Sequence, residues 1–200
     1  MADLYSNTND GTCFSGNQSS WAAARDHAGT TSQTNAATTS VFVKVARVGT
    51  RGGGTAYSVN RSFYYFDTSG ITGTVSSATL KIYGYSSTTD GSAIAVKSTA
   101  FGGDGGTALV AGDFNNITGY STGASLAGSA TDYSATILTT AWSGSGYNDF
   151  ASTADLRTDM QNDNVVIICV MDYTNDYLNS ALTSNATLNC GGYYTDYTGT

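Results

Sequence analysis

The sequence predicts an all-β protein, an antiparallel jelly-roll β-sandwich with one short helix. Its composition is the first reason: the 200-residue chain has 24 Gly and 14 Tyr but no Glu, and all of its 15 acidic residues are Asp. Glu favours helices, whereas Asp and Gly favour turns and Tyr favours strands. The second reason is that short apolar runs recur along the chain, separated by turn-forming residues, as is typical of sandwiches.

The clearest pair of strands lies in residues 63–85, FYYFDTSGITGTVSSATLKIYGY. Side chains of the aromatic run 63–66 alternate in direction, so both faces of this strand are expected to be covered. Residues 67–70 end it, because Asp, Thr and Ser side chains bond to a turn backbone and Gly permits unusual dihedral angles. The returning strand is predicted to place Leu80, Ile82 and, after Gly84, Tyr85 on one face, with Thr79, Lys81 and Tyr83 opposite.

The other predicted elements follow at short intervals. Residues 164–173, NVVIICVMDY, form the strongest apolar run and are predicted to be a central strand. Residues 154–163 are the best helix candidate, since Leu156 and Met160 lie on one helical face. A single helical turn capped by Ser20 is expected at 19–26. Further strands are predicted at 40–48, 92–101, 132–142 and 186–197. Residues 1–39 form a loop-rich N-terminal segment, and the whole chain, 1–200, is predicted to be one domain.

The charge of the chain limits its partners. The net charge is −7, which argues against nucleic acid, because phosphate binding requires a basic face. Lys44, Arg47 and Arg51, with Arg61 further on, are interpreted as a solvated strand edge. No apolar run approaches the roughly 20 residues of a membrane span, and the first residues lack the pattern of a signal peptide. The expected location is therefore a virion surface or the extracellular space, reached by lysis, by assembly or through a leader that Met replaces here.

The three cysteines predict no metal site, since no CxxC motif occurs. Cys169 lies within the strongest strand and is expected to be an inert core thiol. Cys13 and Cys190 are able to pair, but nothing in their spacing requires it.

The segment RSFYYFDTSGITGTVSSATLKIYG resembles the motif of the DNRLRE, or disaggregatase-related, β-sandwich domains. The segments after residue 140 resemble the second half of phage-encoded versions, so the resemblance covers about residues 40–200. It implies a jelly-roll module of carbohydrate-binding or surface-attachment proteins and, in phages, of virion structural proteins. The matching residues are Arg61, Phe66, Asp67, Ser69, Ile71, Ser77, Ala78, Leu80 and Tyr83.

The resemblance also implies a further closing strand after Thr200. We therefore expect either a longer natural chain or a final strand supplied by a neighbouring copy. An open strand edge is then expected beside residues 165–170.

Catalytic residues are not predicted. His27 is the only His, it lies in an expected loop, and the chain has no GxSxG motif. Clustered oxygen-bearing residues at 7–12 and 172–177 resemble calcium ligands, but neither matches the twelve-residue calcium loop. Turn-forming Asx residues are the favoured interpretation of both, so no cofactor is predicted and Ca²⁺ remains the alternative.

Carbohydrate binding requires exposed aromatic faces beside amide and carboxylate groups, because sugar C–H faces stack on rings while the hydroxyls take hydrogen bonds. An oligomer contact or packing at the ends of the sandwich is the alternative for such rings. Two candidate groups have this composition, with Tyr193, Tyr194 and Tyr197 expected near the second: Trp142, Tyr147, Asn148 and Asp149; and Tyr173, Asn175, Asp176 and Tyr177.

These features together favour a non-enzymatic bacteriophage structural protein, such as a capsid decoration, fibre or spike subunit. Its expected partners are other virion proteins, copies of itself, and host or environmental carbohydrate. The alternative is a carbohydrate-binding module of a secreted or cell-surface protein.

Overall fold

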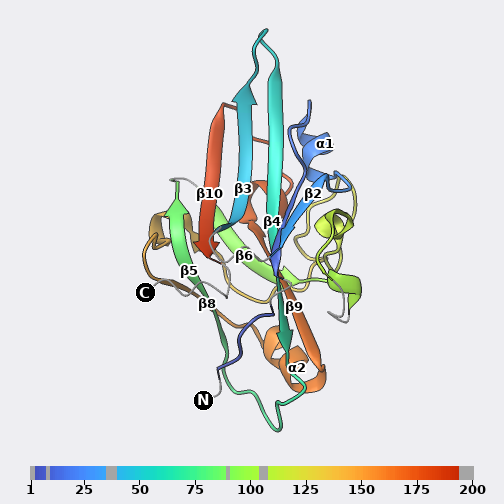
Figure 1. The fold of residues 1–200 in the computed structure, drawn as a ribbon, viewed down its shortest axis with the longest axis vertical. Helices are drawn as coiled ribbons and strands as arrows, with labels where there is room; N and C mark the ends of the chain where they lie inside the picture. The colour runs from blue at the N-terminus through green and yellow to red at the C-terminus, as the bar shows by residue number, and fades with distance from the viewer. Residues whose placement is uncertain (1–2, 8–9, 35–39, 89–90, 104–107, 194–200) are drawn as a thin grey trace.

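The computed structural model describes the chain except residues 1–2, 8–9, 35–39, 89–90, 104–107 and 194–200. It confirms an all-β antiparallel fold (Figure 1). The strands are β1 (Gly11–Phe14), β2 (Thr31–Thr34), β3 (Ser40–Gly49), β4 (Thr55–Asp67), β5 (Thr79–Ser87), β6 (Ser92–Lys97), β7 (Ile137–Leu138), β8 (Tyr147–Ala151), β9 (Val165–Asp172) and β10 (Ala186–Tyr193). The helices are α1 (Trp21–Arg25), α2 (Ala154–Asn162), the short 3-10 helices η1 (Phe101–Gly103), η2 (Ala111–Asn115) and η3 (Thr139–Ala141), and the π-helical turn η4 (Tyr173–Tyr177).

Both predicted helices form, for the reasons that the sequence gives. Ser20 caps α1 and accepts a hydrogen bond from the Ala23 amide, and Thr153 caps α2 in the same way. Leu156 is buried in the core beside the partly buried Met160. No helix in the described ranges is long and apolar enough to cross a membrane.

One sheet contains the described strands, in the order β7-β6-β9-β4-β3-β10-β5-β8; β1 also pairs with β4, and β2 pairs with β1. Its two ends approach each other through residues 132–134. Asp132 bridges Val96 in β6, and Ser134 bridges Ser152 at the end of β8. The sheet therefore almost closes on itself.

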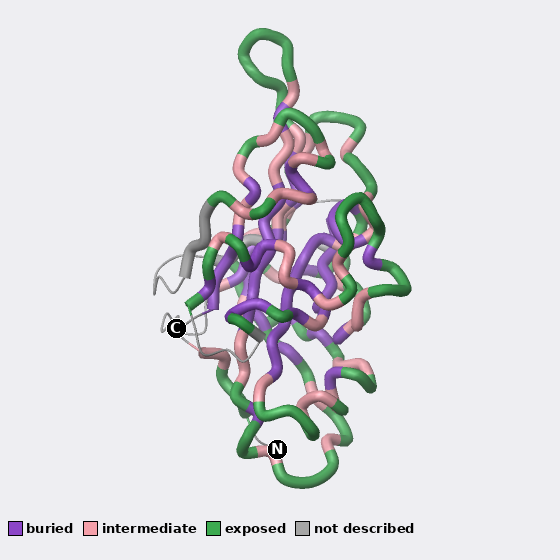
Figure 2. The backbone as a smooth tube through the Cα atoms, turned by 90° about the vertical axis from the view of Figure 1, so that its right-hand side faces the viewer, coloured by how far each residue is buried: buried purple, intermediate pink, exposed green. Residues whose placement is uncertain are grey.

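The central strands β4, β6 and β9 have two apolar faces, as predicted for residues 63–66. In β9, Ile167 and Cys169 belong to one buried cluster, whereas Val166 and Ile168 belong to the other. The second cluster is enclosed by the curved sheet. The first lies between β4, β6 and β9 and a covering layer, which consists of α1, the described residues 99–103 and 108–130, and η4. Figure 2 shows these buried segments surrounded by exposed connections.

Two expectations about strands were wrong. β9 has no open edge at residues 168–170, where it pairs with β4 on one side and with β6 on the other, and residues 165–167 pair with β4. Most of the strand predicted at 132–142 is irregular, with Ile137 and Leu138 as its regular strand residues, and it forms the connection that closes the sheet. Residues 194–197 of the last predicted strand lie outside the described residues.

Candidate functional site

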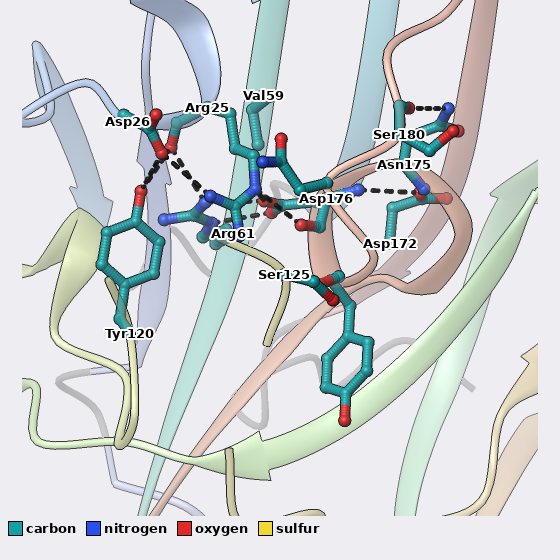
Figure 3. Close-up of polar contacts among 12 residues, drawn as sticks. Arg25, Asp26, Val59, Arg61, Tyr120, Ser125, Asp172, Asn175, Asp176 and Ser180 are labelled. Carbon is teal, nitrogen blue, oxygen red and sulfur yellow. Dashed lines mark hydrogen bonds and ion pairs between the residues drawn. The ribbon is translucent and has the colours of Figure 1, made fainter. Parts of the chain in front are cut away.

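The second predicted sugar-binding group lies inside the protein. Asn175 is 5%, Asp176 0% and Tyr177 3% exposed, and Tyr173 stacks on Tyr177. The η4 turn folds back at the end of β9 because the Asp172 carboxylate accepts hydrogen bonds from the amides of Asn175 and Asp176 (Figure 3). The prediction that this group faces solvent was therefore wrong for its three buried members.

Asp176 instead forms a bidentate ion pair with Arg61 of β4. The Nε and NH2 groups of Arg61 donate to Asp176 Oδ2 and Oδ1 at 2.7 and 2.6 Å. The other donors reach the carbonyls of Phe114 and Arg25 and the side chain of Asn115. All five N–H donors of the guanidinium are thus used. Arg61, expected at a solvated edge, is 0% exposed.

A second arginine extends this network towards the surface. Arg25, also fully buried, donates to the Asp176 carbonyl and to the Asp26 carboxylate. Asp26 also accepts from the Tyr120 hydroxyl at 2.6 Å, and both arginines lie over the Tyr120 ring. Two guanidinium groups therefore face two carboxylates.

The electrostatics of this network keep Arg61 charged. Burial by itself lowers the pKa of a guanidinium, but the Asp176 carboxylate more than offsets this and raises the pKa of Arg61 above its ordinary value. The fixed ion pair joins β4 to η4, η2 and α1, so it is structural and is not available to a ligand.

Asp172 is in a different environment four residues earlier. Burial raises its pKa from 3.8 to about 6, and the Asp176 charge adds to the rise, while the amides of Asn175, Asp176 and Ser92 oppose it. Its oxygens face the backbone of the turn.

The first predicted group is divided between the interior and the surface. Trp142 is 6% exposed and donates to the Gly191 carbonyl, and Asn148 is 4% exposed and bonds to the backbone of residues 143–146 and Ile82. These two side chains were wrongly expected at the surface. Tyr147, 64% exposed, and Asp149, 56% exposed at its side chain, do face solvent.

Tyr147 belongs to a row of rings that we call the tyrosine face: Tyr147, Tyr83, Tyr193 and Tyr85. Successive ring centroids lie 5.2, 6.1 and 5.3 Å apart. Tyr147 and Tyr85, at the two ends, are 64% and 49% exposed, while the middle pair is half-buried. Neighbouring rings meet at 87°, 43° and 74°, so the row presents faces and edges in turn.

The strand register explains this row. Tyr83 on β5 pairs with Tyr147 on β8, and β10 pairs with the other edge of β5. Tyr85 was wrongly expected to face the core with Leu80 and Ile82. The alternation of β5 continues without a break, so Gly84 takes the next inward position and Tyr85 lies on the outward side with Lys81 and Tyr83.

Gly84 occupies the inward position between the two tyrosines. A Cβ atom there would lie 1.6 Å from the carbonyl oxygen of Ser143. The loop before β8 therefore packs directly on the β5 backbone at Gly84. This contact covers the inner side of β5, while the tyrosine rings lie on the outer side.

Charged and polar groups flank the tyrosine face. Lys81 Nζ lies 6.0 Å from the Tyr147 ring centroid and 3.8 Å from Asp149 Oδ2. The Tyr83 hydroxyl donates to the Ser145 carbonyl. The row thus combines apolar ring surface with a cation and a carboxylate.

A hollow of about 490 Å³ lies beside the end of β6 and the start of β9. Lys97, on its wall, forms an ion pair with Asp159 at 2.9 Å, and the Tyr133 hydroxyl donates to the same carboxylate. Lys97, Asp159 and the Tyr133 hydroxyl thus already bond to one another. The Tyr133 ring is buried and does not offer a face for a ligand to stack on.

The remaining predicted groups have structural surroundings. Cys13, Cys169 and Cys190 are free and buried, with Cys13 and Cys190 in different apolar clusters. The His27 carbonyl accepts a hydrogen bond from Asn115. No set of three or more His, Cys, Asp or Glu side chains within the described residues is placed to hold a metal ion. Of the segment 7–12, residues 8–9 lie outside the described part, and Asp10 accepts from the Tyr65 amide.

Comparison with known proteins adds no relative: no protein-family model matches the chain, and no curated protein matches its sequence.

We predict that Asp176→Asn lowers the free energy of unfolding by about 3–5 kcal/mol, because it leaves Arg61 as an unneutralised buried cation. Urea denaturation measures the change. The control is Asp149→Asn, which breaks the exposed pair with Lys81 and should cost less than about 1 kcal/mol. Equal losses in the two variants would contradict a structural role for the buried pair.

The raised pKa of Asp172 predicts a pH dependence of stability. The folded state holds this proton more tightly than the unfolded state, so the stabilisation is full below about pH 4 and is lost as the pH rises through about 6. Relative to Asp172→Asn, the wild type should lose about 3 kcal/mol of unfolding free energy between about pH 4 and pH 7. Denaturation curves across this range test it, and parallel pH profiles of the two proteins would refute it.

Proposed function

We propose that this chain is a non-enzymatic structural protein of a bacteriophage particle, a capsid decoration, fibre or spike subunit, that binds carbohydrate through its tyrosine face. The observation that carries the binding part is the row of four rings across β8, β5 and β10, with its two most exposed rings at the ends.

The geometry of the row suits a sugar chain better than a deep-pocket ligand. An exposed ring stacks on the apolar C–H face of a sugar, and its hydroxyl and neighbouring charged groups bond to sugar hydroxyls. Tyr147 and Tyr85 supply two such rings, and Lys81 and Asp149 supply a donor and an acceptor beside the first. The strands fix all four rings, so little side-chain freedom is lost on binding.

The particle part of the proposal is supported by the resemblance of residues 61–84 to the DNRLRE motif and of the segments after residue 140 to phage-encoded versions of that domain. It is also supported by a composition poor in charge and rich in Ser, Thr and Gly. The second candidate, a carbohydrate-binding module of a secreted or cell-surface protein, rests on the same tyrosine face and differs in where the protein acts.

Replacing Tyr147 or Tyr85 with Ala should weaken glycan binding at least tenfold, because each change removes an exposed stacking ring. Retention in polysaccharide-containing gels selects a glycan, and calorimetry then measures the affinity. Tyr5→Ala is the matched control, since Tyr5 is 77% exposed in the N-terminal segment outside this row. If both variants bind glycan as tightly as the wild type, the sugar site lies elsewhere. If no glycan retains the wild type, the binding function is refuted.

Quantitative mass spectrometry of purified particles from the source of the gene tests the virion role. Hundreds of copies per particle are expected for a capsid decoration protein, and a few tens for a tail or fibre protein. Absence from particles would refute the virion role and leave the secreted module as the function to test.

A further inference from the structure

The hairpin between β3 and β4 extends beyond the rest of the molecule along its long axis (Figures 1 and 2). We call residues 47–57 the arm. Its strands remain paired up to Gly49 and Thr55, and Tyr57 braces its base by accepting a hydrogen bond from Arg47 and contacting the Trp21 ring. Beyond Arg51 the tip contains Gly52 and Gly53 with positive φ, which add no side chain around it.

The arm is basic in an otherwise acidic protein. No Asp or Glu occurs between residues 27 and 66, and the arm carries Arg47 and the exposed Arg51. Neither makes an ion pair with a carboxylate of the described residues, since Arg47 bonds to Tyr57 and Asn185 instead. The arm thus presents positive charge that the described part of its own chain does not neutralise.

The opposite end of the long axis is acidic. Figure 1 shows α2 and the C-terminal end of β4 there. This acidic pole contains the exposed residues Asp67, Asp155 and Asp163, together with the half-buried Asp159. Lys97 and Arg157 offset part of this charge. Hydrogen bonds from Ser69 lower the pKa of Asp67, so it stays ionised at neutral pH.

The two charged ends are too far apart to neutralise each other. β4 runs from the arm at Thr55 to the acidic pole at Asp67, a span of roughly 40 Å at about 3.3 Å per residue. This distance is several times the screening length of about 8 Å at physiological salt. Lys97 already lies at contact distance from Asp159 and Asp163. Arg51 on the arm and Asp67 and Asp155 at the acidic pole form no ion pair with the described residues, so their charges can be matched at contact distance only by another molecule.

We propose that the arm of one copy docks on the acidic pole of the next, so that copies of this chain associate head to tail. Such a contact joins two different surfaces, so it leaves a free arm and a free pole and can extend into a row or close into a ring. Individual exposed ion pairs are weak, so the association is salt-sensitive and becomes strong where many copies are held on one particle. The inference goes beyond glycan binding and does not depend on it, since it uses a different surface.

Sedimentation velocity at low salt, without glycan, tests the proposal on the full chain. The wild type should self-associate in a concentration-dependent way that 0.5 M salt weakens at least tenfold. An arm variant, Thr50→Asp with Arg51→Asp, and a pole variant, Asp155→Lys with Asp163→Lys, should each sediment as monomers. Circular dichroism confirms that both variants are folded.

Mixing the two variants gives the decisive result. The acidic arm of one complements the basic pole of the other, and the remaining arm and pole also match, so the mixture should associate although neither variant does alone. Lys81→Asp, a charge reversal on the tyrosine face, should associate like the wild type. A monomeric wild type at low salt, a mixture that stays monomeric, or association abolished by Lys81→Asp would overturn the proposal.

Discussion

The ion pair between Arg61 and Asp176 is the contact on which the covering layer depends. Both side chains have no exposed surface, and moving each charge out of water costs several kcal/mol. This cost is offset only if every donor and acceptor is satisfied, and the guanidinium meets that condition with five hydrogen bonds. Its partners are Arg25 of α1, Phe114 and Asn115 of η2, and Asp176 of η4, so these segments must take their places together.

The covering layer needs such a contact because its own sequence is poor in periodic apolar residues. The segment 99–130 is rich in Gly, Ser and Thr and has few apolar anchors, among them Phe101, Phe114 and Leu126. These anchors give burial energy but little direction, since apolar packing is non-directional. The directed bonds of Arg61 to the Phe114 carbonyl and Asn115 supply the register of this layer over β4 and β9.

Local pattern was enough to predict the strands that carry this core, but not the environment of the connections between them. The strongest continuous apolar run identified β9 as central, and the four-residue spacing of Leu156 and Met160 identified α2. Asn175 and Asp176 have the composition of a surface turn, and their burial depends on Arg61, which lies 115 residues earlier than Asp176. Trp142 was likewise expected at the surface, because its neighbours in sequence do not show that a carbonyl of β10 accepts its N–H. Tyr85 was misplaced because the prediction broke the alternation at Gly84, whereas the strand keeps it and Gly84 itself takes the inward position.

The use of arginine inside the protein also shapes its outside. The chain has only eight basic residues, and Arg25 and Arg61 are buried with internal carboxylates. Because so few cations remain for the surface, their positions matter more than their number. Lys81 lies beside the most exposed ring of the tyrosine face, and Arg47 and Arg51 lie on the arm. Elsewhere hydroxyl, amide and Asp side chains hydrate most of the surface. The glycan contact proposed above therefore relies on rings and hydrogen bonds at the tyrosine face, and the proposed contact between copies relies on the charge contrast between the two ends of the long axis.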